Sequence, residues 1–394
     1  MPTNTLITSS ILSKETLIIL ENNLVAANKV HRTFKNEFTK IGSTLSIRKP
    51  VKFTVTDGAT LALQDVQEPT TSITINTQKH VGFQFTSQEL TLVIEEFKER
   101  YLKNIGSELA NAVDYDVISN WPNVYNVVGT RGTVPAGFAA LAAVGQRMDE
   151  EAVPQDGRTL LLTPAAYWNL ATGMSAVFVQ PVAEPALKGA LVNLANLEIY
   201  VDQNTQFETV GALGGTPVVD GGAQTGSSLA TSGWTASVAN LLRPGNVFTI
   251  AGVFAVNPKN RQTTGVLRQF VVTAAVSSDA GGFATIPIYP AITPTGAYQT
   301  VTASPLNGAA ITVSGTAGVQ YGQNLAFTKD AFGLVIVPLE VPQGADFAAR
   351  DLYKNISLRV WRDSDIVNDA FPTRVDVLYG TATWYPELAV RLTN

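Results

Sequence analysis

The longest helix signal in this chain is residues 86–120, TSQELTLVIEEFKERYLKNIGSELANAVDYDVISN. Its apolar residues recur in steps of three and four, so they share one face of an α-helix: Leu90, Ile94, Phe97, Tyr101, Ile105, Leu109, Val113 and Val117. Thr86 and Glu89 form a capping box at the start, and Trp121-Pro122 supplies the stop. Such a helix would be roughly 50 Å long. We therefore predict a spine helix along which other elements are laid out.

Acidic residues crowd the outer faces of this predicted helix. Seven acidic and three basic residues leave a net charge of −4 there, most of the −5 of the whole chain. Pairs four residues apart, such as Glu96 with Arg100, are typical of a solvated helix face. The alternative is that Glu95 and Glu99 face an enclosed space or a neighbouring subunit.

Composition narrows the class of protein before any motif does. With 394 residues, 45% hydrophobic and 15% charged, the chain is long enough for two or three cores and too apolar for disorder. It has no cysteine and only His31 and His80, so a disulfide framework is excluded and little imidazole is left for zinc or base catalysis. A pI near 5.2 argues against a nucleic-acid reader. No membrane-length apolar run or signal peptide is seen, so we expect a soluble, non-exported protein.

Residues 1–41 are predicted to form an N-terminal arm. Ser13 is the expected N-cap of a first helix, which ends near Val30 and has one apolar face: Leu17, Leu20, Leu24 and Ala27. A lone amphipathic helix cannot bury its stripe against itself. The arm must therefore dock on the body of the protein or on a neighbouring chain.

Residues 42–85 predict an extended two-stranded ribbon. Residues 43–55 and 73–85 alternate apolar and polar side chains with a period of two. The connection between them, residues 56–72, is longer than a hairpin needs. Because two strands alone are only marginally stable in water, we expect this ribbon to lean on a partner subunit.

Residues 121–215 predict a compact α/β or α+β unit. Helices are expected over residues 135–151, from Thr163-Pro164 onward and over 185–194, and strands over 159–162 and 197–201. Around Val210 a Gly, Ser and Thr-rich stretch reads as a linker.

Residues 216–319 predict a small β-barrel or sandwich. Their short β segments are punctuated by Gly and Pro: 247–250, 270–276, 284–288 and 311–313. Residues 320–394 again show the sequence patterns found before the β unit. We therefore interpret the β unit as an insertion into an α+β domain.

No motif in the chain carries strong catalytic, cofactor or metal chemistry. Asp363, Asp365 and Asp369 lack the central Gly and final Glu of an EF-hand and read as a solvated turn. Asp114 and Asp116 are two residues apart and do not share a helix face. Two Gly-rich runs lack the Lys-Ser/Thr ending of a phosphate-binding loop: residues 129–132 and 211–215.

Two small basic clusters lie on predicted β elements. One belongs to the ribbon and the other to the β unit: Arg48, Lys49 and Lys52, and Lys259, Arg261 and Arg268. As solvated edges they would protect strands from wrong pairing, and as functional groups they would meet acidic faces on neighbours. We expect residues 257–268 to be an exposed hairpin that docks on an adjacent subunit.

Several local strings and their order resemble the major capsid proteins of tailed bacteriophages, in particular the P22 coat protein family. The strings are TLLLTPAAYWNL (159–170), ALVNLANLEIYVDQN (190–204), RPGNVFTIAGV (243–253), NLAFTKDAFGLVIVPL (324–339) and RVDVLYGTATWYPELAVRL (374–392). The resemblance covers essentially the whole chain and departs most in the loops of the insertion. No Lys and Asn pair matches the covalent crosslink of the HK97 capsid.

This resemblance implies the HK97 fold. Its parts would be the arm (1–41), the extended loop (42–85), the spine helix of the peripheral domain (86–120), the axial domain (121–215), the inserted β domain (216–319) and a return to the axial and peripheral domains (320–394). It also implies pentamers and hexamers of an icosahedral shell around double-stranded DNA, assembled in the bacterial host cytoplasm with a scaffolding protein and a portal. No enzyme activity, cofactor or membrane is implied.

The residues themselves favour a self-assembling subunit, because arm, ribbon and spine have faces that one chain cannot bury. The residues expected at contacts between subunits are Arg48, Lys49, Lys52, Asp57, Glu68, Glu95, Glu99, Lys259, Arg261 and Arg268. One alternative is an α/β enzyme that uses carboxylates such as Asp363 and Asp365. Another is a β-rich fibre or adhesin subunit.

Overall fold

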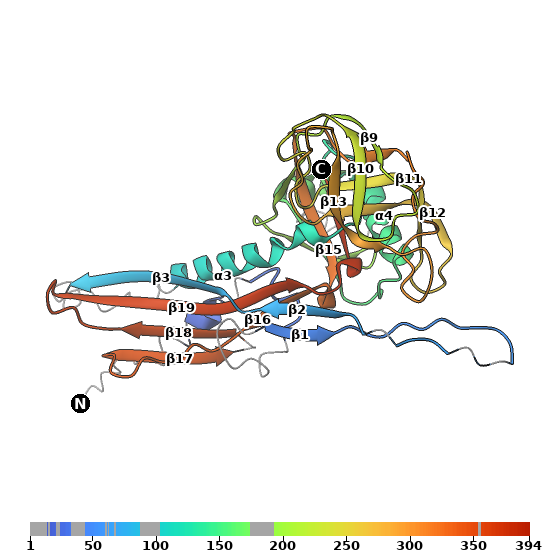
Figure 1. The fold of residues 1–394 in the computed structure, drawn as a ribbon. Coiled ribbons are helices and arrows are strands. Elements are labelled where there is room, and N and C mark those ends of the chain that lie inside the picture. The colour runs from blue at the N-terminus through green and yellow to red at the C-terminus, as the bar shows by residue number, and fades with distance from the viewer. Residues whose placement is uncertain are drawn as a thin grey trace. The chain divides into compact units, whose positions relative to one another are not determined.

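The structure is a computed structural model that describes residues 14, 16–20, 24–32, 44–59, 61, 63–66, 68–86, 103–173, 193–353 and 356–394. It divides into two units, whose elements are labelled in Figure 1. The first unit comprises Met1–Ile47, Thr71–Val117 and Phe332–Trp384. The second comprises Arg48–Thr70, Ile118–Ala331 and Tyr385–Asn394. Within the described part of the chain, no helix is both long and apolar enough to cross a membrane.

An antiparallel sheet of five strands forms the body of the first unit. β17 (Phe347–Tyr353), β18 (Ile356–Arg362) and β19 (Ala370–Thr383) lie in that order. The other edge of β19 pairs first with β3 (Thr77–Thr86) and then with β16 (Phe332–Ile336). Figure 1 shows β3, β19, β18 and β17 side by side. The fourteen-residue β19 is therefore the central strand that joins chain segments from both ends of the sequence.

The described part of the spine helix is α3, Lys103–Ile118. Its predicted apolar face is confirmed there, because Ile105, Leu109, Val113 and Val117 are all buried. Residues 87–102 lie outside the described residues, and so do Glu95 and Glu99. The first half of the predicted helix and the roles of those two carboxylates therefore stay predictions.

The arm docks on α3 of its own chain. The backbone N–H groups of Val25 and Ala27 donate to the two carboxylate oxygens of buried Asp114, at 2.6 and 2.8 Å. Residues 16–20 are helical, and the predicted apolar face of the arm is buried: Leu17, Leu20, Leu24 and Ala27. The helix does not continue to Val30 as expected, since residues 25–30 form bends and turns. A carboxylate on the spine thus replaces the carbonyls of the preceding helical turn as partner for those N–H groups.

The predicted ribbon is shorter than expected. β1 (Thr44–Arg48) pairs with β2 (Thr70–Thr74), but the predicted strand over residues 73–85 is split. Its larger part is β3, which belongs to the five-stranded sheet. The period-two pattern is the same in a free ribbon and in a sheet strand, so the sequence does not distinguish them. The segment that leaves the strands is residues 49–69, which we call the extended loop.

A mixed sheet of seven strands forms the axial part of the second unit. Its strands follow the order β4-β20-β15-β5-β7-β6, with β8 also paired to β15. Their bounds are β4 Val127–Val128, β20 Ala389–Thr393, β15 Gln320–Thr328, β5 Arg158–Leu162, β7 Leu197–Val201, β6 Asn193–Leu194 and β8 Phe207–Thr209. Leu160 and Leu162 of β5, Leu392 of β20 and Leu197 of β7 share one core with the helices α4 and α5.

The helices of this unit agree with the sequence where they are described. α4 is Gly137–Glu150 and α5 is Pro164–Gly173, with Pro at its first position as predicted. The predicted helix over 185–194 falls mostly outside the described residues, and its last two residues form β6. Short 3₁₀ turns complete the unit: η3 Trp121–Asn123, η4 Lys329–Ala331 and η5 Pro386–Leu388.

The inserted β domain is a six-stranded, nearly closed sheet of order β14-β11-β12-β13-β10-β9. The strands are β9 Gly215–Val219, β10 Gly226–Trp234, β11 Val247–Val256, β12 Thr263–Val272, β13 Ala284–Ile292 and β14 Ile311–Val313. A bridge between Val218 and Ala310 brings the two end strands together. Its core includes Phe248, Ile250, Phe270, Val272, Ile286 and Ile288.

The Gly and Ser-rich stretch after Val210 is not a linker, because β9 and β10 form there. Val219, Leu229 and Trp234 point into the core of the β domain, and Thr231 is buried as well. The high Gly and Ser content of this stretch masks the few side chains that alternate into the core. Secondary structure here is determined by pairing with β13 rather than by local propensity.

Candidate assembly surfaces

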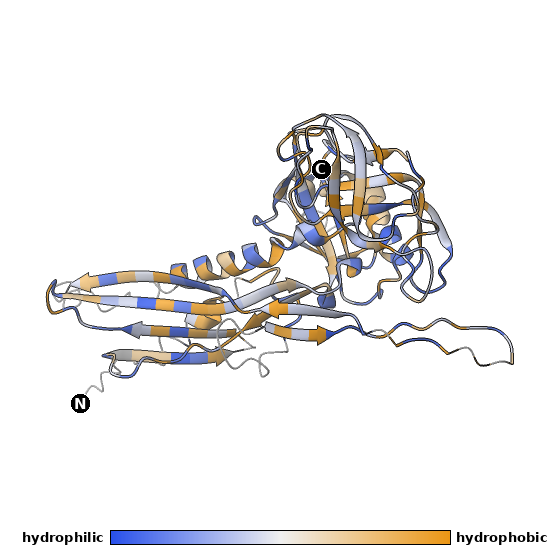
Figure 2. Ribbon diagram, in the orientation of Figure 1, coloured by the Kyte–Doolittle hydropathy of each residue, from blue (hydrophilic) through white to orange (hydrophobic). Residues whose placement is uncertain are grey.

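The extended loop displays large apolar side chains that its own chain does not cover. Five of them are between 59% and 94% exposed: Phe53, Val55, Leu61, Leu63 and Val66. In Figure 2, hydrophobic and hydrophilic residues alternate along this loop. Scattered apolar residues on a surface are ordinary, but a row of five on one protruding segment is typical of an interaction site.

Polar contacts tie the two arms of the extended loop to each other. The backbone N–H and the hydroxyl of Thr54 both donate to Gln64 Oε1, at 2.8 and 2.7 Å, and Gln64 Nε2 donates back to the Thr54 carbonyl. At the base, the Arg48 guanidinium lies 3.1 Å from Glu68, and Lys49 N–H donates to the Pro69 carbonyl at 2.8 Å. The loop therefore has a defined shape before it meets any partner. Arg48 and Glu68 pair with each other within the chain.

The basic residues at the base of the loop contact the same chain. Lys49 Nζ lies 4.9 Å from the centre of the Tyr385 ring, and Lys52 N–H donates to Tyr298 Oη at 3.2 Å. Burial lowers the pKa of Lys49, although the charge of Glu387 opposes this. The sequence does not reveal these partners, because they are far away along the chain. Tyr298, for example, lies 246 residues from Lys52.

The predicted docking hairpin of the β domain is only residues 257–262. Lys259 is exposed there, as predicted. Arg261 Nη2 donates to the Phe53 carbonyl of the extended loop of its own chain at 2.7 Å. Asn257 fixes the turn by accepting the Lys259 N–H and by donating to the Glu150 carbonyl. The hairpin thus donates a hydrogen bond to the base of the extended loop.

The prediction that Arg268 is exposed on this hairpin is wrong. Arg268 lies on strand β12, is 4% exposed, and donates to Glu151 Oε1 at 2.7 Å. Its guanidinium lies 4.5 Å from the centre of the Tyr125 ring. The Arg268 side chain points from β12 toward the axial part of the unit. A buried arginine is stable there because a carboxylate and an aromatic ring lie beside it.

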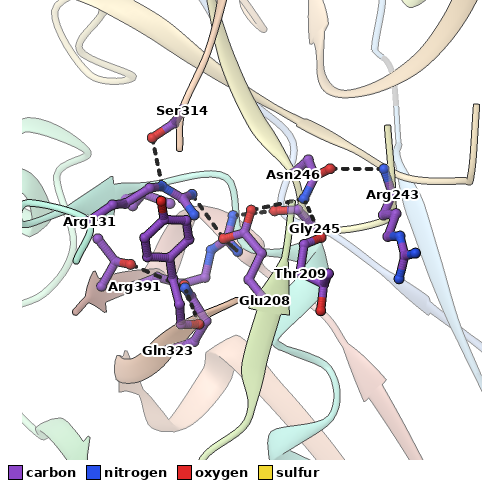
Figure 3. Close-up of polar contacts among 12 residues, drawn as sticks. Arg131, Glu208, Thr209, Arg243, Gly245, Asn246, Ser314, Gln323 and Arg391 are labelled. Carbon is purple, nitrogen blue, oxygen red and sulfur yellow. Dashed lines mark hydrogen bonds and ion pairs between the residues drawn. The ribbon is translucent and has the colours of Figure 1, made fainter. Parts of the chain in front are cut away.

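A second buried charge cluster surrounds Glu208 of β8 (Figure 3). Arg131 Nη2 lies 2.9 Å and Arg391 Nη1 lies 3.4 Å from Glu208 Oε2. The other carboxylate oxygen accepts from Asn246 Nδ2 at 3.0 Å. Burial lowers the pKa of Arg391 to about 10, which leaves the guanidinium charged at neutral pH. Two cations therefore share one carboxylate in the interior.

This cluster joins the axial strands to the β domain. Arg391 belongs to β20 and donates to the Gly245 carbonyl at 2.9 Å, and Arg131 Nε donates to Ser314 at 2.8 Å. Gly245 and Ser314 flank strands β11 and β14 of the β domain. The apolar residues Val127 and Val247 pack together beside this junction. Together with Arg268 and Glu151, these contacts fix one orientation of the β domain on the axial sheet.

The carboxylates considered for enzyme chemistry have structural partners. Asp114 binds the arm, and Asp116 accepts the Tyr379 hydroxyl at 2.5 Å and lies 3.3 Å from Lys79. Asp365 accepts hydrogen bonds inside its own turn. No group of three His, Asp or Glu side chains among the described residues is placed to hold a metal ion.

Sequence reasoning missed the second exposed apolar feature of the chain. Ile366 and Val367 are 97% and 85% exposed on the turn between β18 and β19. The available signal was two adjacent large apolar residues inside an acidic turn, DSDIVND.

A docked arm, a spine helix, a five-stranded sheet, an extended loop and an axial α/β sheet define the HK97-like fold of phage major capsid proteins. The chain belongs to the P22 coat protein (gene protein 5) family, whose model matches residues 1–393. It is a major capsid protein that forms an icosahedral shell, and its role in the virion capsid is structural.

Several solved structures are similar to this chain. A structure from Mycobacterium phage Che8 is 14% identical, covers 94% of this chain and 90% of its own, and superposes with a TM-score of 0.51. The capsid of the cyanophage P-SCSP1u is 12% identical, with 92% and 85% coverage and a TM-score of 0.44. The capsid of a native GTA particle is 8% identical, with 100% and 92% coverage and a TM-score of 0.45. No curated protein matched the sequence.

Proposed function

We propose that copies of this coat protein assemble as pentamers and hexamers, and that the extended loop is the element with which each copy holds its neighbour. The observation that carries this proposal is the row of exposed apolar side chains on residues 53–66. Their burial against another subunit would contribute roughly 25 cal/mol per Å² of apolar surface. Identical subunits in closed rings repeat such a heterologous contact at every interface.

The internal contacts of the loop support this role. Thr54 and Gln64 hold its two arms together, and Arg261 and Tyr298 hold its base. A preorganised loop loses little conformational entropy on binding, so more of the burial energy remains for affinity. Asp57 and Lys259 are exposed and remain free to form polar contacts at the rim of the interface.

The test replaces the apolar side chains and keeps the loop. We expect Leu61→Ser, Leu63→Ser and Val66→Ser together to abolish shells and to leave the melting temperature of the subunit unchanged. The matched control changes polar residues of the same loop: Thr56→Ser and Asp65→Asn. Sedimentation and negative-stain microscopy give the readout. Normal shells from the apolar triple variant would show that the loop is not the element that joins subunits.

The shell is proposed to enclose double-stranded DNA and to be assembled in the host cytoplasm with a scaffolding protein and a portal. The family supports these partners, and the acidic net charge of −5 suits a container that must not adhere to packed DNA. Glu95 and Glu99 are proposed to face the lumen or a neighbour. If Glu95→Lys with Glu99→Lys packaged DNA as well as the parent, this assignment would be wrong.

A further inference from the structure

The turn between β18 and β19 presents two apolar side chains in a fixed position. Asp365 accepts hydrogen bonds from the Val367 N–H at 3.0 Å and from Asn368 Nδ2 at 2.7 Å. Its backbone N–H donates to the Ala370 carbonyl at 2.8 Å, and the Ala370 N–H donates back at 3.2 Å. The turn is thereby closed by its own groups. Ile366 and Val367 are left at its apex, 97% and 85% exposed.

An open groove of about 570 Å³ lies on the exposed face of the same sheet. Strand register places Gly82 of β3 opposite Arg374 of β19, and Arg374 opposite Trp361 of β18. The space above Gly82 is open, because a Cβ built there would have only the Thr373 carbonyl oxygen within reach, at 4.0 Å. The remaining lining residues are His80, Phe83, Gln84, Asp363, Pro372 and Thr373.

The groove is firmly built at one end and cationic at its centre. Buried Asp376 accepts from Arg359 Nη2 at 2.6 Å, from Trp361 Nε1 at 3.3 Å and from Arg374 Nε. These contacts hold the indole and the Arg374 guanidinium in place. The Arg374 side chain remains 37% exposed. The groove therefore offers the Trp361 indole, the guanidinium of Arg374 and, toward the turn, the carboxylate of Asp363.

We propose that the apex Ile366-Val367 of one subunit occupies this groove on a second copy of the chain. The apex is apolar and is flanked by three aspartates, Asp363, Asp365 and Asp369. Its apolar side chains match the space over Gly82, and its acidic flank matches Arg374. A second copy is the occupant because a shell-forming protein meets its own surface at every contact. The inference rests on the proposed assembly into rings.

Disulfide trapping tests this pairing, because the chain has no cysteine of its own. The double variant Gly82→Cys with Ile366→Cys is assembled into shells, oxidised and run on a non-reducing gel. A bond within one chain is excluded by register: Thr86, opposite Ala370, is four residues along β3 from Gly82, roughly 13 Å. A disulfide requires Cα atoms within about 7 Å.

We expect the double variant to give a ladder of crosslinked species, and each single variant to stay monomeric. A double variant that crosslinks no more than the single variants would overturn the proposal. Crosslinking by Ile366→Cys alone would also overturn it, because it would show that two apices meet each other. Parent protein that forms no shells at all would instead contradict the proposed function.

Filling the groove gives an independent test. Gly82→Val fits the strand conformation and the space above it, so the melting temperature of the subunit is expected to stay unchanged. The added side chain should exclude the apex and reduce shell yield at least tenfold, as should Ile366→Ser with Val367→Ser. Ser364→Ala, on the same turn, serves as the control. Normal shell yield from Gly82→Val would contradict the docking.

Discussion

Arg268 Nη1 lies 2.7 Å from Glu151 Oε1, and each side chain is only 4% exposed. The two residues are 117 positions apart and belong to the inserted β domain and to the end of α4. Burial by itself would lower the pKa of Arg268, but Tyr125 and Glu151 raise it overall. The Arg268 guanidinium therefore stays charged in the folded subunit. It sets the orientation of the β domain, and that domain in turn braces the extended loop through Arg261.

Removal of one member of this pair should be more costly than removal of both. We expect Arg268→Met or Glu151→Leu alone to lower the free energy of unfolding by about 3–5 kcal/mol, because each leaves an unpaired buried charge. The double variant should lose less than the sum of the two. Urea unfolding of the four proteins measures the coupling. Additive losses would mean that the two side chains do not interact as the structure shows.

Glu208→Gln should destabilise the subunit, because it leaves two buried guanidinium groups without a carboxylate. About 3–5 kcal/mol is expected. Exposed Glu340→Gln is the control and should stay within about 0.5 kcal/mol of the parent. The measurement is chemical denaturation of unassembled subunits. Equal stability of the two variants would contradict the role assigned to the Glu208 cluster.

The inserted β domain, residues 216–319, is predicted to fold alone. Its core consists of residues between Val219 and Ile311, and roughly 100 residues can bury enough surface for a stable core. Because Leu213 packs on that core, a fragment that begins at residue 210 should melt at a higher temperature than one that begins at 216. Circular dichroism follows both. A fragment without a cooperative transition would refute the autonomy of the domain.

The turn at Asp365 should lose stability at acid pH. Hydrogen bonds from the Asn368 side chain and from the Val367 N–H hold the pKa of Asp365 below its usual value of 3.8. A depressed carboxyl pKa stabilises the folded state above pH 3.8, and this contribution is lost as pH falls through the folded pKa. Asp365→Asn should therefore melt below the parent at pH 7, and the difference should shrink as the pH falls below 3.8. A difference independent of pH would argue against this role.

Hydrophobic periodicity predicts an element when its partners are local or when one of its faces is apolar along its whole length. The spine face through Ile105, Leu109 and Val113 is an example, because a 3.6-residue repeat is visible in one segment. β3 was misplaced in a ribbon because its partner, β19, lies about three hundred residues further along the chain. Alternation shows that a strand has two faces, but it does not show what covers each of them.

The candidate contacts were harder to predict than the fold. Arg268 and Arg261 were grouped as one basic hairpin by their spacing, yet one is buried against Glu151 and the other holds the Phe53 carbonyl. Charge patterns in a sequence do not reveal which cations find a partner inside the subunit. The exposed apolar residues Leu61, Leu63 and Ile366 were overlooked because apolar side chains are ordinarily assigned to the core.

Electron microscopy and sedimentation of the expressed protein, alone and together with the products of its neighbouring genes, show whether this chain forms shells. A coat protein held together by its extended loop should give closed icosahedral shells of uniform size, and the Leu61→Ser, Leu63→Ser and Val66→Ser variant should remain as unassembled subunits. A small, catalytically active oligomer that never forms shells under any of these conditions would contradict the assignment of this chain as a coat protein.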